Sequence, residues 1–536
     1  MIPGLSLIGA GMDSCVIDTR QLLTMQNYKS IEMQDSCLVK GFYILSTNDF
    51  DYGSGIWAEY QSGLITQNKF SEANRGIDLF GSNVTVYKNY FFNIRSGIGV
   101  GNSNSIVRKN VIYMNVEGVE GIRVEGFSSS YRPVIDSNYI DNVYDTGIYK
   151  FLGTIPTIKN NIIIVKYSTG IELHESDSAK VYNNIILNAG YAGIDSYFEI
   201  NLLIENNYIK GKPSSDGIRV GPNSIIKNNV ITNTGKGIGK YGSQDPVVQY
   251  NNLWNNTINY DGITPDTTNL SVDPMVVNSD TTQGDLDFHL QKYSPLIDAG
   301  DPNILDKDGT RSDIGLYGGP YGESYNYQEL APKPPRGLVA DVDSSLITLT
   351  WNRNTEADFN HYNLYRDTTV NFQIDSTKLV ASITDTFYLH IIPQGVERLY
   401  FKLTGVDNQG NESNPSEEVA VILVSVKNEW KPVNNYILYQ NYPNPFNPTT
   451  KIGYKLKERG YVKLYVYDVK GELVEVLVNQ TQEAGYYEVE FNGEGKTELI
   501  GVKNPFVSGV YLCQIIIQSE KGIPVFSDMI KMILLK

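Results

Sequence analysis

Short segments in which apolar and polar residues alternate recur along the first half of the chain. Val181–Leu187 and Ile225–Ile231 are two of them, and Asn or Gly residues separate successive segments. Alternation with a period of two is typical of β-strands, in which neighbouring side chains point to opposite faces. The pattern therefore predicts short strands with an apolar inner face and a polar outer face, and we expect almost no helix.

These strands belong to a repeat of about 22 residues. A unit of this size cannot bury its apolar face alone, so we expect the copies to stack into a solenoid in which each repeated side chain forms a column. Ile columns should fill the interior, each Asn should hydrogen-bond the next Asn and the turn backbone, and each Gly should provide a bend before a strand. The Gly-Ile pairs begin at Gly55, Gly76, Gly97, Gly121, Gly147, Gly170, Gly193, Gly217 and Gly237, and the Asn residues are Asn68, Asn89, Asn110, Asn138, Asn161, Asn184, Asn207, Asn229 and Asn252.

The pattern Gly-Ile-x-Leu-x followed by x-Val-x-Asn-Asn-x-Ile resembles the right-handed parallel β-helix of the pectate-lyase-like superfamily. The resemblance covers about residues 1–260 and implies a β-helix domain over residues 1–262. Many unrelated functions share this scaffold, so the resemblance indicates a fold rather than an activity. The familiar catalytic signatures of polygalacturonases and pectate lyases are not visible in this sequence.

Two further regions follow the repeats. Residues 263–331 lose the period, look like the closing segment of secreted β-helix proteins, and should cover the unpaired edge of the last coil. After the linker Pro332–Pro335, residues 332–426 combine alternating strands with a core Trp351 and resemble a fibronectin type III module. We expect an all-β chain: a right-handed parallel β-helix followed by two small β-sandwich domains.

The second sandwich, residues 436–536, resembles the C-terminal sorting domain of the type IX secretion system. The resemblance rests on Gln440–Pro448, Val462–Asp468 and the ending Lys531–Lys536. It implies export by the type IX machinery to the surface, or outside, of a Bacteroidota-like Gram-negative bacterium. Such cargo normally carries a signal peptide, which the start of this sequence lacks, so we expect the native N-terminus to lie further upstream. The sorting signal would comprise Gly509, Tyr511, Lys531 and Lys536.

Composition and charge narrow the possible partners. Hydrophobic residues make up 41% and charged residues 19%, and no apolar run approaches the ~18 residues of a membrane-spanning helix. We therefore expect a soluble monomer without membrane insertion. The formal charge of −16 disfavours nucleic acid, because nucleic-acid binding needs basic surface. Three cysteines form neither a disulfide framework nor a zinc site, and no cofactor motif is visible.

Candidate chemistry lies on the strands that follow each Gly-Ile pair. Since alternate side chains point outward, the outward positions can be read as two columns. The first outward column is Trp57, Asp78, Gly99, Arg123, Tyr149, Glu172, Asp195, Arg219 and Gly239; the second is Glu59, Phe80, Gly101, Glu125, Phe151, His174, Tyr197, Gly221 and Tyr241. Exposed aromatic rings of this kind commonly stack on sugar faces, so Tyr149, Phe151, Tyr197 and Tyr241 are the expected substrate-binding residues. Lys150 and Lys240 fall at inward positions, which suggests that the register slips in some coils.

Glu172 and Asp195 are expected on adjacent coils, with backbones about 4.8 Å apart. Two carboxylates this close favour a raised pKa for one of them or a bridging cation. A shared proton suits hydrolysis of a glycosidic bond with retaining geometry. A bridging calcium suits a lyase in which Arg123, Arg219 or His174 is the base. The alternative is an ordinary solvated surface in which Arg219 neutralises Asp195.

The sequence thus favours a carbohydrate-active β-helix protein, a lyase or hydrolase for a plant or algal polysaccharide, with catalytic residues Glu172, Asp195, His174, Arg123 and Arg219. The alternative is a non-catalytic surface adhesin or glycan-binding protein. A further calcium site could be formed by Asp306, Asp308 and Asp313, although a structural turn explains these residues better, because Tyr317 stands where the helix-loop-helix calcium motif has its final Glu. No other cofactor is expected.

Overall fold

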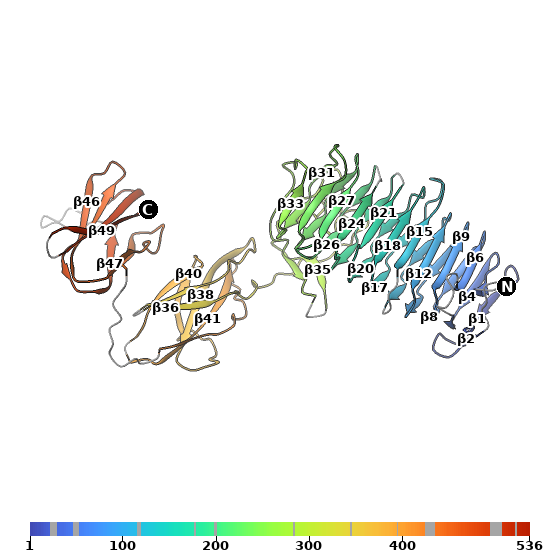
Figure 1. Ribbon diagram of the computed structural model, residues 1–536, viewed down its shortest axis with the longest axis horizontal. Coiled ribbons are helices and arrows are strands. Elements are labelled where there is room, and N and C mark those ends of the chain that lie inside the picture. Colours follow the sequence, from blue (N-terminus) through green and yellow to red (C-terminus); the bar gives the residue numbers. More distant parts are fainter. Residues whose placement is uncertain are drawn as a thin grey trace. The chain divides into compact units, whose positions relative to one another are not determined.

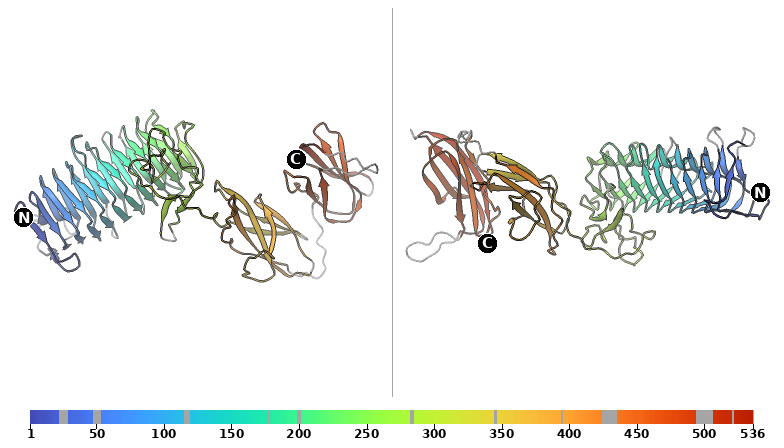
Figure 2. Two further views of the ribbon diagram at one scale, coloured as in Figure 1. Left: turned by 180° about the vertical axis from the view of Figure 1, so that it is seen from behind. Right: turned by 90° about the horizontal axis from the view of Figure 1, so that it is seen from below.

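A computed structural model describes residues 1–21, 29–46, 53–114, 119–175, 178–197, 201–281, 285–343, 346–393, 395–423, 435–493, 506–519 and 522–535. Within these residues the protein is all-β, without a helix. The first part is a parallel solenoid whose coils each contribute one strand to three sheets (Figures 1 and 2). Each sheet has eleven strands, in which strand n pairs with strand n+3. The expected fold class is confirmed.

The strands of the three sheets are short. Sheet 1 comprises β1 (Ser6–Ile8), β4 (Cys37–Lys40), β7 (Ser62–Thr66), β10 (Asn83–Tyr87), β13 (Ile106–Arg108), β16 (Val134–Asp136), β19 (Thr157–Lys159), β22 (Lys180–Tyr182), β25 (Leu203–Glu205), β28 (Ile225–Lys227) and β31 (Val247–Gln249). Sheet 2 comprises β2 (Val16–Asp18), β5 (Tyr43–Leu45), β8 (Lys69–Ser71), β11 (Tyr90–Phe92), β14 (Val111–Tyr113), β17 (Tyr139–Val143), β20 (Ile162–Val165), β23 (Ile185–Leu187), β26 (Tyr208–Lys210), β29 (Val230–Thr232) and β32 (Asn252–Trp254). Sheet 3 comprises β3 (Lys29–Glu32), β6 (Ser54–Glu59), β9 (Arg75–Phe80), β12 (Ser96–Gly101), β15 (Glu120–Glu125), β18 (Thr146–Phe151), β21 (Ile171–His174), β24 (Ala192–Tyr197), β27 (Asp216–Val220), β30 (Lys236–Lys240) and β33 (Ile258–Asp261).

A ladder of asparagines runs through the interior, as the sequence predicts. From Asn89 to Asn229, each side-chain oxygen accepts hydrogen bonds from the backbone and side-chain N–H groups of the Asn one coil earlier. The oxygen of Asn68 accepts a hydrogen bond from the backbone N–H of Phe42. Each amide also donates to a main-chain carbonyl, as Asn184 does to Ile158. These bonds satisfy buried amides that would otherwise be unpaired. One position was predicted wrongly: Asn251, not Asn252, continues the ladder to Asn269.

The repeated glycines do not make bends, contrary to the expectation. All but Gly170, which directly precedes β21, lie within the strands of sheet 3, and none of them has a positive φ. Their backbones instead pack against one another: a Cβ on Gly147 would meet the carbonyl oxygen of Gly170 at 2.6 Å and the side chain of Ile163 at 2.4 Å. Glycine is therefore required here for close approach between coils rather than for its backbone freedom.

The bend is made by the residue that precedes each ladder asparagine. That residue has a left-handed backbone in every coil, from Gln67 (φ 52°) to Tyr250 (φ 54°). Asn tolerates this conformation better than most residues, and it occupies the position in four consecutive coils, at Asn160, Asn183, Asn206 and Asn228. The Asn-Asn doublets of the sequence therefore combine an outer turn residue with an inner ladder residue.

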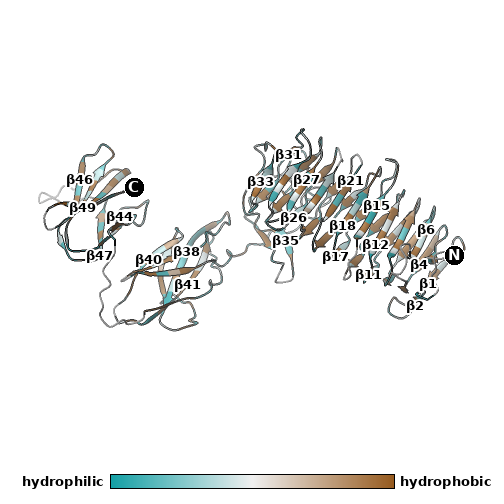
Figure 3. Ribbon diagram, viewed as in Figure 1, coloured by the Kyte–Doolittle hydropathy of each residue, from teal (hydrophilic) through white to brown (hydrophobic). Residues whose placement is uncertain are grey.

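The interior is apolar, and the inward Ile columns are confirmed. Ile98, Ile122, Ile148, Ile171 and Ile194 are fully buried in one column of sheet 3, and hydropathy alternates along the strands (Figure 3). No register slip occurs at the inward lysines: Lys150 pairs with Val124 and Leu173, is fully buried, and donates a hydrogen bond to the carbonyl of His174 at 2.9 Å. Lys240 pairs with Val220 and forms an ion pair with Asp245.

The segment after the repeats closes the last coil and also covers one side of the solenoid. Leu270 exchanges backbone hydrogen bonds with the last coil, as a cap should. The following residues, with β34 (Val276–Asn278) and β35 (Asp287–Leu290), pack instead on the outer face of sheet 2. There Phe288, Leu296 and Leu316 belong to one apolar cluster with Leu187 and Tyr208. The expected end cap is thus mainly a lateral cover, because sheet 2 presents apolar residues outward in these coils.

Asparagine turn residues hold this cover in place. The Asn183 side chain donates to the carbonyls of Leu316 and Gly318, and the Asn206 side chain donates to those of Asp313 and Gly315. Asn228 accepts a hydrogen bond from the backbone of Asp301 at 2.8 Å. Three consecutive coils are therefore bonded to the same covering segment.

The chain divides into two compact units, residues 1–332 with 355–359, and residues 333–354 with 360–536. The second unit contains two seven-stranded antiparallel arrangements. The first consists of β36 (Val339–Asp343), β37 (Leu346–Thr350) and β40 (Phe387–Ile391), and of β39 (Leu379–Ile383), β38 (Phe359–Asp367), β41 (Arg398–Asp407) and β42 (Val419–Ile422). The second consists of β43 (Ile437–Leu438), β44 (Thr449–Leu456) and β47 (Gly485–Asn492), and of β46 (Leu473–Gln482), β45 (Gly460–Asp468), β48 (Gly509–Gln518) and β49 (Pro524–Leu534). Trp351 is buried, as predicted, and no helix capable of crossing a membrane occurs in the described residues.

Candidate functional site

The outer face of sheet 3 carries the residues singled out from the sequence. Backbone pairing places Arg123, Tyr149, Glu172, Asp195 and Arg219 side by side in the first outward column. The second outward column runs through Glu125, Phe151, His174 and Tyr197 in the same coils. The linear periodicity of the sequence thus becomes a contiguous surface on five adjacent coils.

Glu172 and His174 form the central polar pair of this surface. The Glu172 Oε1 atom lies 2.8 Å from His174 Nε2, and Thr146 donates a hydrogen bond to Glu172 Oε2 at 2.9 Å. Both side chains are partly open, with 22% and 24% of their area exposed. Nε2 of His174 has no hydrogen-bond partner in this geometry, so the two groups lie in close contact without a well-aligned hydrogen bond. A carboxylate at this distance orients the imidazole ring.

Asp195 is more enclosed than expected. Only 5% of the residue is exposed, and Tyr241 donates a hydrogen bond to its Oδ1 at 2.8 Å. Burial raises the pKa of the Asp195 carboxyl, although the bond from Tyr241 and the charge of Arg219 oppose this. Burial also raises the pKa of Tyr241, and its bond to Asp195 adds to the effect. The cause of the Asp195 shift is therefore desolvation and not repulsion by Glu172.

The two carboxylates do not act as one pair. They stand in register on adjacent strands, but Glu172 contacts Thr146 and His174, whereas Asp195 contacts Tyr241. A proton or calcium ion shared between them, as the sequence suggested, would require both carboxylates to turn away from these partners. This arrangement gives hydrolysis by a close carboxylate pair less support than the backbone register alone implied.

Each arginine of the strip is held by acids. Arg123 bonds to Glu120 at 2.9 Å and to Glu125 at 2.8 Å. Arg219 pairs with Asp216 at 3.3 Å, and its charge also opposes the rise in the pKa of Asp195. Paired, permanently charged guanidinium groups are poor bases, but they present fixed N–H donors to a ligand. Arg123 and Arg219 thus fit binding better than proton abstraction.

Aromatic rings surround the central pair without a break. Ring centroids are 6.2 Å apart for Tyr149 and Phe151 and 5.6 Å apart for Tyr149 and His174. The run continues from His174 to Tyr197 at 6.1 Å and from Tyr197 to Tyr241 at 5.2 Å. Burial raises the pKa of Tyr149, so this phenol keeps its proton at neutral pH. The expected substrate-binding residues therefore lie together.

Sequence reasoning missed several supporting residues. Thr146 binds Glu172, Asp216 binds Arg219, and Tyr191 accepts a hydrogen bond from Arg219 Nη1 at 2.6 Å. All three lie at or just before the start of a strand. The predicted columns included only residues that follow a Gly-Ile pair, so these positions were left out. Complementary charges three residues apart were the available signal, since the same spacing joins Arg75 to Asp78 and Glu120 to Arg123.

The expected calcium ligands in the covering segment do not gather. Asp306 accepts backbone hydrogen bonds from Asp313 and Gly319, and Asp308 accepts two from Thr310. Asp313 accepts bonds from the backbone of Asp298 and the hydroxyl of Tyr327. No group of three or more metal-ligating side chains occurs among the described residues. The turn explanation fits these aspartates, because their oxygens organise the loop itself.

The residues predicted as a sorting signal lie in the last sheet. Gly509 and Tyr511 begin β48, and the Tyr511 hydroxyl donates to the carbonyl of Val507 at 2.8 Å. Lys531 pairs with Leu512, and its carbonyl accepts bonds from the side chains of Gln440 and Asn444. The Asn-rich start of the domain and its last strand are thus joined. Lys536 lies outside the described residues.

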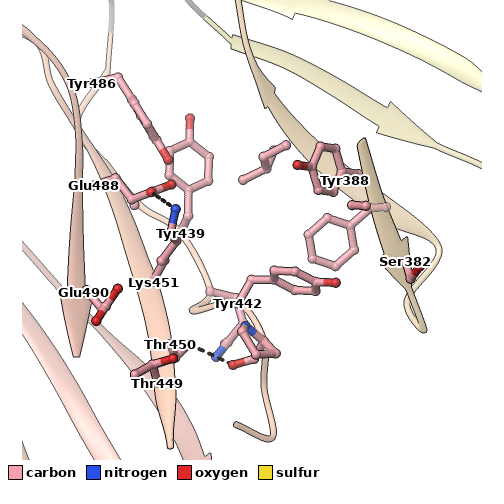
Figure 4. A pocket seen from close by; sticks show the side chains of 16 residues that line it. Ser382, Tyr388, Tyr439, Tyr442, Thr449, Thr450, Lys451, Tyr486, Glu488 and Glu490 are labelled. Atoms are coloured by element: carbon pink, nitrogen blue, oxygen red, sulfur yellow. Dashed lines mark hydrogen bonds and ion pairs between the residues drawn. The ribbon is translucent and has the colours of Figure 1, made fainter. Parts of the chain in front are cut away.

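A pocket in the second unit was not anticipated. Figure 4 shows the wall that the C-terminal sandwich contributes, where Lys451 and Glu488 pair at 2.8 Å between β44 and β47. Tyr439 and Tyr486 stand above this pair with ring centroids 6.0 Å apart. Glu490 adds a second carboxylate to this wall, beside the Lys451–Glu488 pair.

Comparison with known proteins identifies the solenoid. A family model described as the right-handed β-helix region matches residues 30–186 and 169–282. The solenoid is a right-handed β-helix. No curated protein matches the chain.

Several solved structures also match parts of this chain. An Fn3-like protein from Clostridium thermocellum is 32% identical over 17% of this chain and 92% of that chain, with a TM-score of 0.15. The fibronectin type III domain of human fibronectin type III domain containing protein 3 is 20% identical over 19% and 91%, with a TM-score of 0.15. A mutant of the periplasmic alginate epimerase AlgG is 14% identical over 45% and 68%, with a TM-score of 0.30. The β-helix protein therefore has fibronectin type III-like structural neighbours.

Proposed function

We propose that sheet 3 is the active face of a polysaccharide lyase, secreted or held at the cell surface. The observation that carries this proposal is the partly open Glu172–His174 pair, set in an unbroken run of aromatic rings. The rings offer flat faces for sugars, and the pair offers a base beside them. The buried Asp195 supports this face by accepting the hydrogen bond of Tyr241.

The roles follow from what each group can give or take. Glu172 lies against Nε2 of His174, and we assign Nδ1 as the nitrogen that takes the proton from the ring carbon next to a uronate carboxyl group. As the carbon–hydrogen bond breaks, its electron pair forms a carbon–carbon double bond, and the glycosidic oxygen leaves from the neighbouring carbon. Tyr149 keeps its proton at neutral pH and lies beside His174, so it can protonate the leaving oxygen. Arg123 and Arg219 flank the pair and attract the uronate carboxylate.

A second candidate is non-catalytic binding of glycans. Its support is that Arg123 and Arg219 already have acidic partners on the protein itself, as in an ordinary stable surface. The same rings would then bind polysaccharide without cleaving it, and the protein would act as an adhesin.

A panel of uronate and neutral polysaccharides separates these functions. We expect wild type to produce unsaturated ends that absorb ultraviolet light, and His174→Asn to reduce this rate by about 10²–10⁴-fold, the usual contribution of a general base. Glu172→Gln should reduce it less, because the base remains. Glu205→Gln is the matched control: Glu205 is another half-buried carboxyl, paired with Lys227 at 3.1 Å, but on sheet 1.

The possible results differ clearly. Reducing ends without ultraviolet absorbance would replace the lyase by a hydrolase. Binding of a polysaccharide without either product would support the non-catalytic adhesin. Equal loss in the sheet 1 control would show that folding, and not the site, was damaged.

Export is proposed on the resemblance of residues 436–536 to a type IX sorting domain. Its support is that the sequence motifs form one sandwich, in which the start of the domain bonds to the last strand. In a host with this secretion system, deletion of residues 436–536 should leave the protein in the periplasm. Surface display of the shortened protein would refute the assignment.

A further inference from the structure

Three exposed tyrosines mark the turns that lead from sheet 2 to sheet 3. Tyr144 precedes β18, Tyr167 precedes β21 and Tyr191 precedes β24, so they occupy three successive coils. They are 43%, 55% and 49% exposed. The rings of Tyr144 and Tyr167 lie 4.8 Å apart between centroids. We call Tyr144, Tyr167 and Tyr191 the tyrosine ledge.

The backbone beneath the ledge is closely packed. A Cβ at Gly190 would lie 2.1 Å from the carbonyl oxygen of Tyr167, so only glycine allows the turn of Tyr191 to rest on the turn of Tyr167. The backbone N–H groups of Gly190 and Tyr191 both donate to the carbonyl of Ser168 at 3.0 Å. The turns beneath the rings are therefore fixed while the side chains are about half exposed, which lowers the entropic cost of binding.

Cationic groups accompany these rings. The Lys166 ammonium lies 5.1 Å from the ring centroid of Tyr167, and Lys212 donates to the carbonyl of Lys166 at 3.0 Å. Neither ammonium forms an ion pair with another described residue, and Asp145 adds one exposed carboxylate beside Tyr144. The ledge thus combines flat rings with hydrogen-bond donors that are open to a ligand.

The ledge is connected to the face of sheet 3 by direct contacts. Arg219 donates to the hydroxyl of Tyr191 at 2.6 Å, and its guanidinium lies 4.5 Å from the ring centroid of Tyr241. Tyr241 in turn donates to Asp195. A ligand that contacts Tyr191 therefore also reaches the edge of the candidate site.

We propose that the tyrosine ledge is a second glycan-binding surface, which holds a linear polysaccharide along the solenoid axis beside sheet 3. This inference rests on the proposed function of that sheet. The rings recur at the coil spacing of about 4.8 Å, so a chain of identical pyranose rings meets equivalent contacts on each coil. The hydroxyls of Tyr144 and Tyr167 and the ammonium of Lys166 donate to groups on the sugar edges.

The test compares long and short ligands. Taking the polysaccharide of the panel that wild type binds best, we expect Tyr144→Ser combined with Tyr167→Ser to weaken binding of the long chain about 10–100-fold, from two lost stacking contacts. Binding of its trisaccharide, which is too short to use both surfaces, should change less than about twofold. Tyr113→Ser is the control, since Tyr113 is 40% exposed on sheet 2. Calorimetric titration and affinity gel electrophoresis give the readout.

A conservative variant and the melting temperature complete the design. Combined Tyr144→Phe and Tyr167→Phe should retain most of the long-chain affinity, because the rings remain. If the Ser variant binds the long chain as well as wild type does, the ledge is refuted while the proposed function stands. If wild type binds no polysaccharide of the panel, the proposed function fails and the ledge with it. If affinity and melting temperature fall together, the loss reflects folding and overturns the ledge.

Discussion

Sheets 2 and 3 arise from the same repeat, yet their outer faces differ in kind. Sheet 2 presents Ile162, Ile185, Tyr208 and Val230 outward, and the segment after the repeats covers them. Sheet 3 presents carboxylates, a histidine, arginines and rings, and no described segment packs over them. Both sheets have inward apolar columns, and the asparagine ladder lies at the turns between sheets 1 and 2. Outward positions thus decide which face stabilises the molecule and which is left for a ligand.

The largest expected effect concerns a matched pair of tyrosines on these faces. Tyr208 is 2% exposed, and its ring centroid lies 4.5 Å from that of Phe288. Tyr208→Ala should lower the free energy of unfolding by about 3–5 kcal/mol, because it leaves a cavity beneath the cover. Tyr197→Ala, at an exposed position of sheet 3, should change it by about 0.5 kcal/mol or less. Denaturant unfolding measures both, and equal losses would contradict the contrast between the two faces.

Two turn asparagines, one bonded to the covering segment and one not, give a second pair of variants. Asn206→Ala removes the hydrogen bonds of this side chain to Ser312 Oγ and to the carbonyls of Asp313 and Gly315 in the covering segment. We expect a loss of about 2–3 kcal/mol in unfolding free energy. Asn160 has the same left-handed backbone but bonds only to Asp136, so Asn160→Ala should cost about 1 kcal/mol or less. Hydrogen exchange of residues 285–330 should rise in the first variant and stay unchanged in the second.

The pH dependence of stability gives a third test of the covering segment on sheet 2. Burial raises the pKa of Asp313, in the cover, from 3.8 to about 6. A raised folded-state pKa stabilises the protein below the unfolded value of 3.8, and this stabilisation is lost as the pH rises through about 6. Relative to Asp313→Asn, wild type should therefore gain about 1–3 kcal/mol between pH 7 and pH 4. Unfolding curves of both proteins across this range would contradict the prediction if their difference were constant.

The smallest effect is expected at Asp195, in the first outward column of sheet 3. Asp195 contacts Tyr241 and acts through it, so Asp195→Asn should raise KM for a cleaved polysaccharide about two- to fivefold while kcat changes less, since one neutral hydrogen bond replaces a stronger one. A roughly 100-fold or larger loss in turnover rate with unchanged KM would instead show that Asp195 takes part in the chemistry. Steady-state kinetics on the panel substrate decides between these results.

The periodicity of the sequence predicted the fold, but it did not predict the side-chain contacts. Backbone register follows from repeat spacing, which is why the positions of Glu172, His174 and Asp195 in the columns were predictable. Side-chain direction depends on neighbours from other coils, such as Thr146, Tyr241 and Asp216, and alternation carries no information about them. The role of the repeated glycines was also predicted wrongly, because a bend and a close approach produce the same residue in the sequence.

The interaction of Asn183, Asn206 and Asn228 with one covering segment has a mechanical consequence. The modules after residue 332 are joined to the solenoid through that segment, so tension applied at the C-terminus is shared among three rungs instead of falling on the terminal one. Separating the solenoid from the covering segment therefore requires the bonds on all three rungs to break.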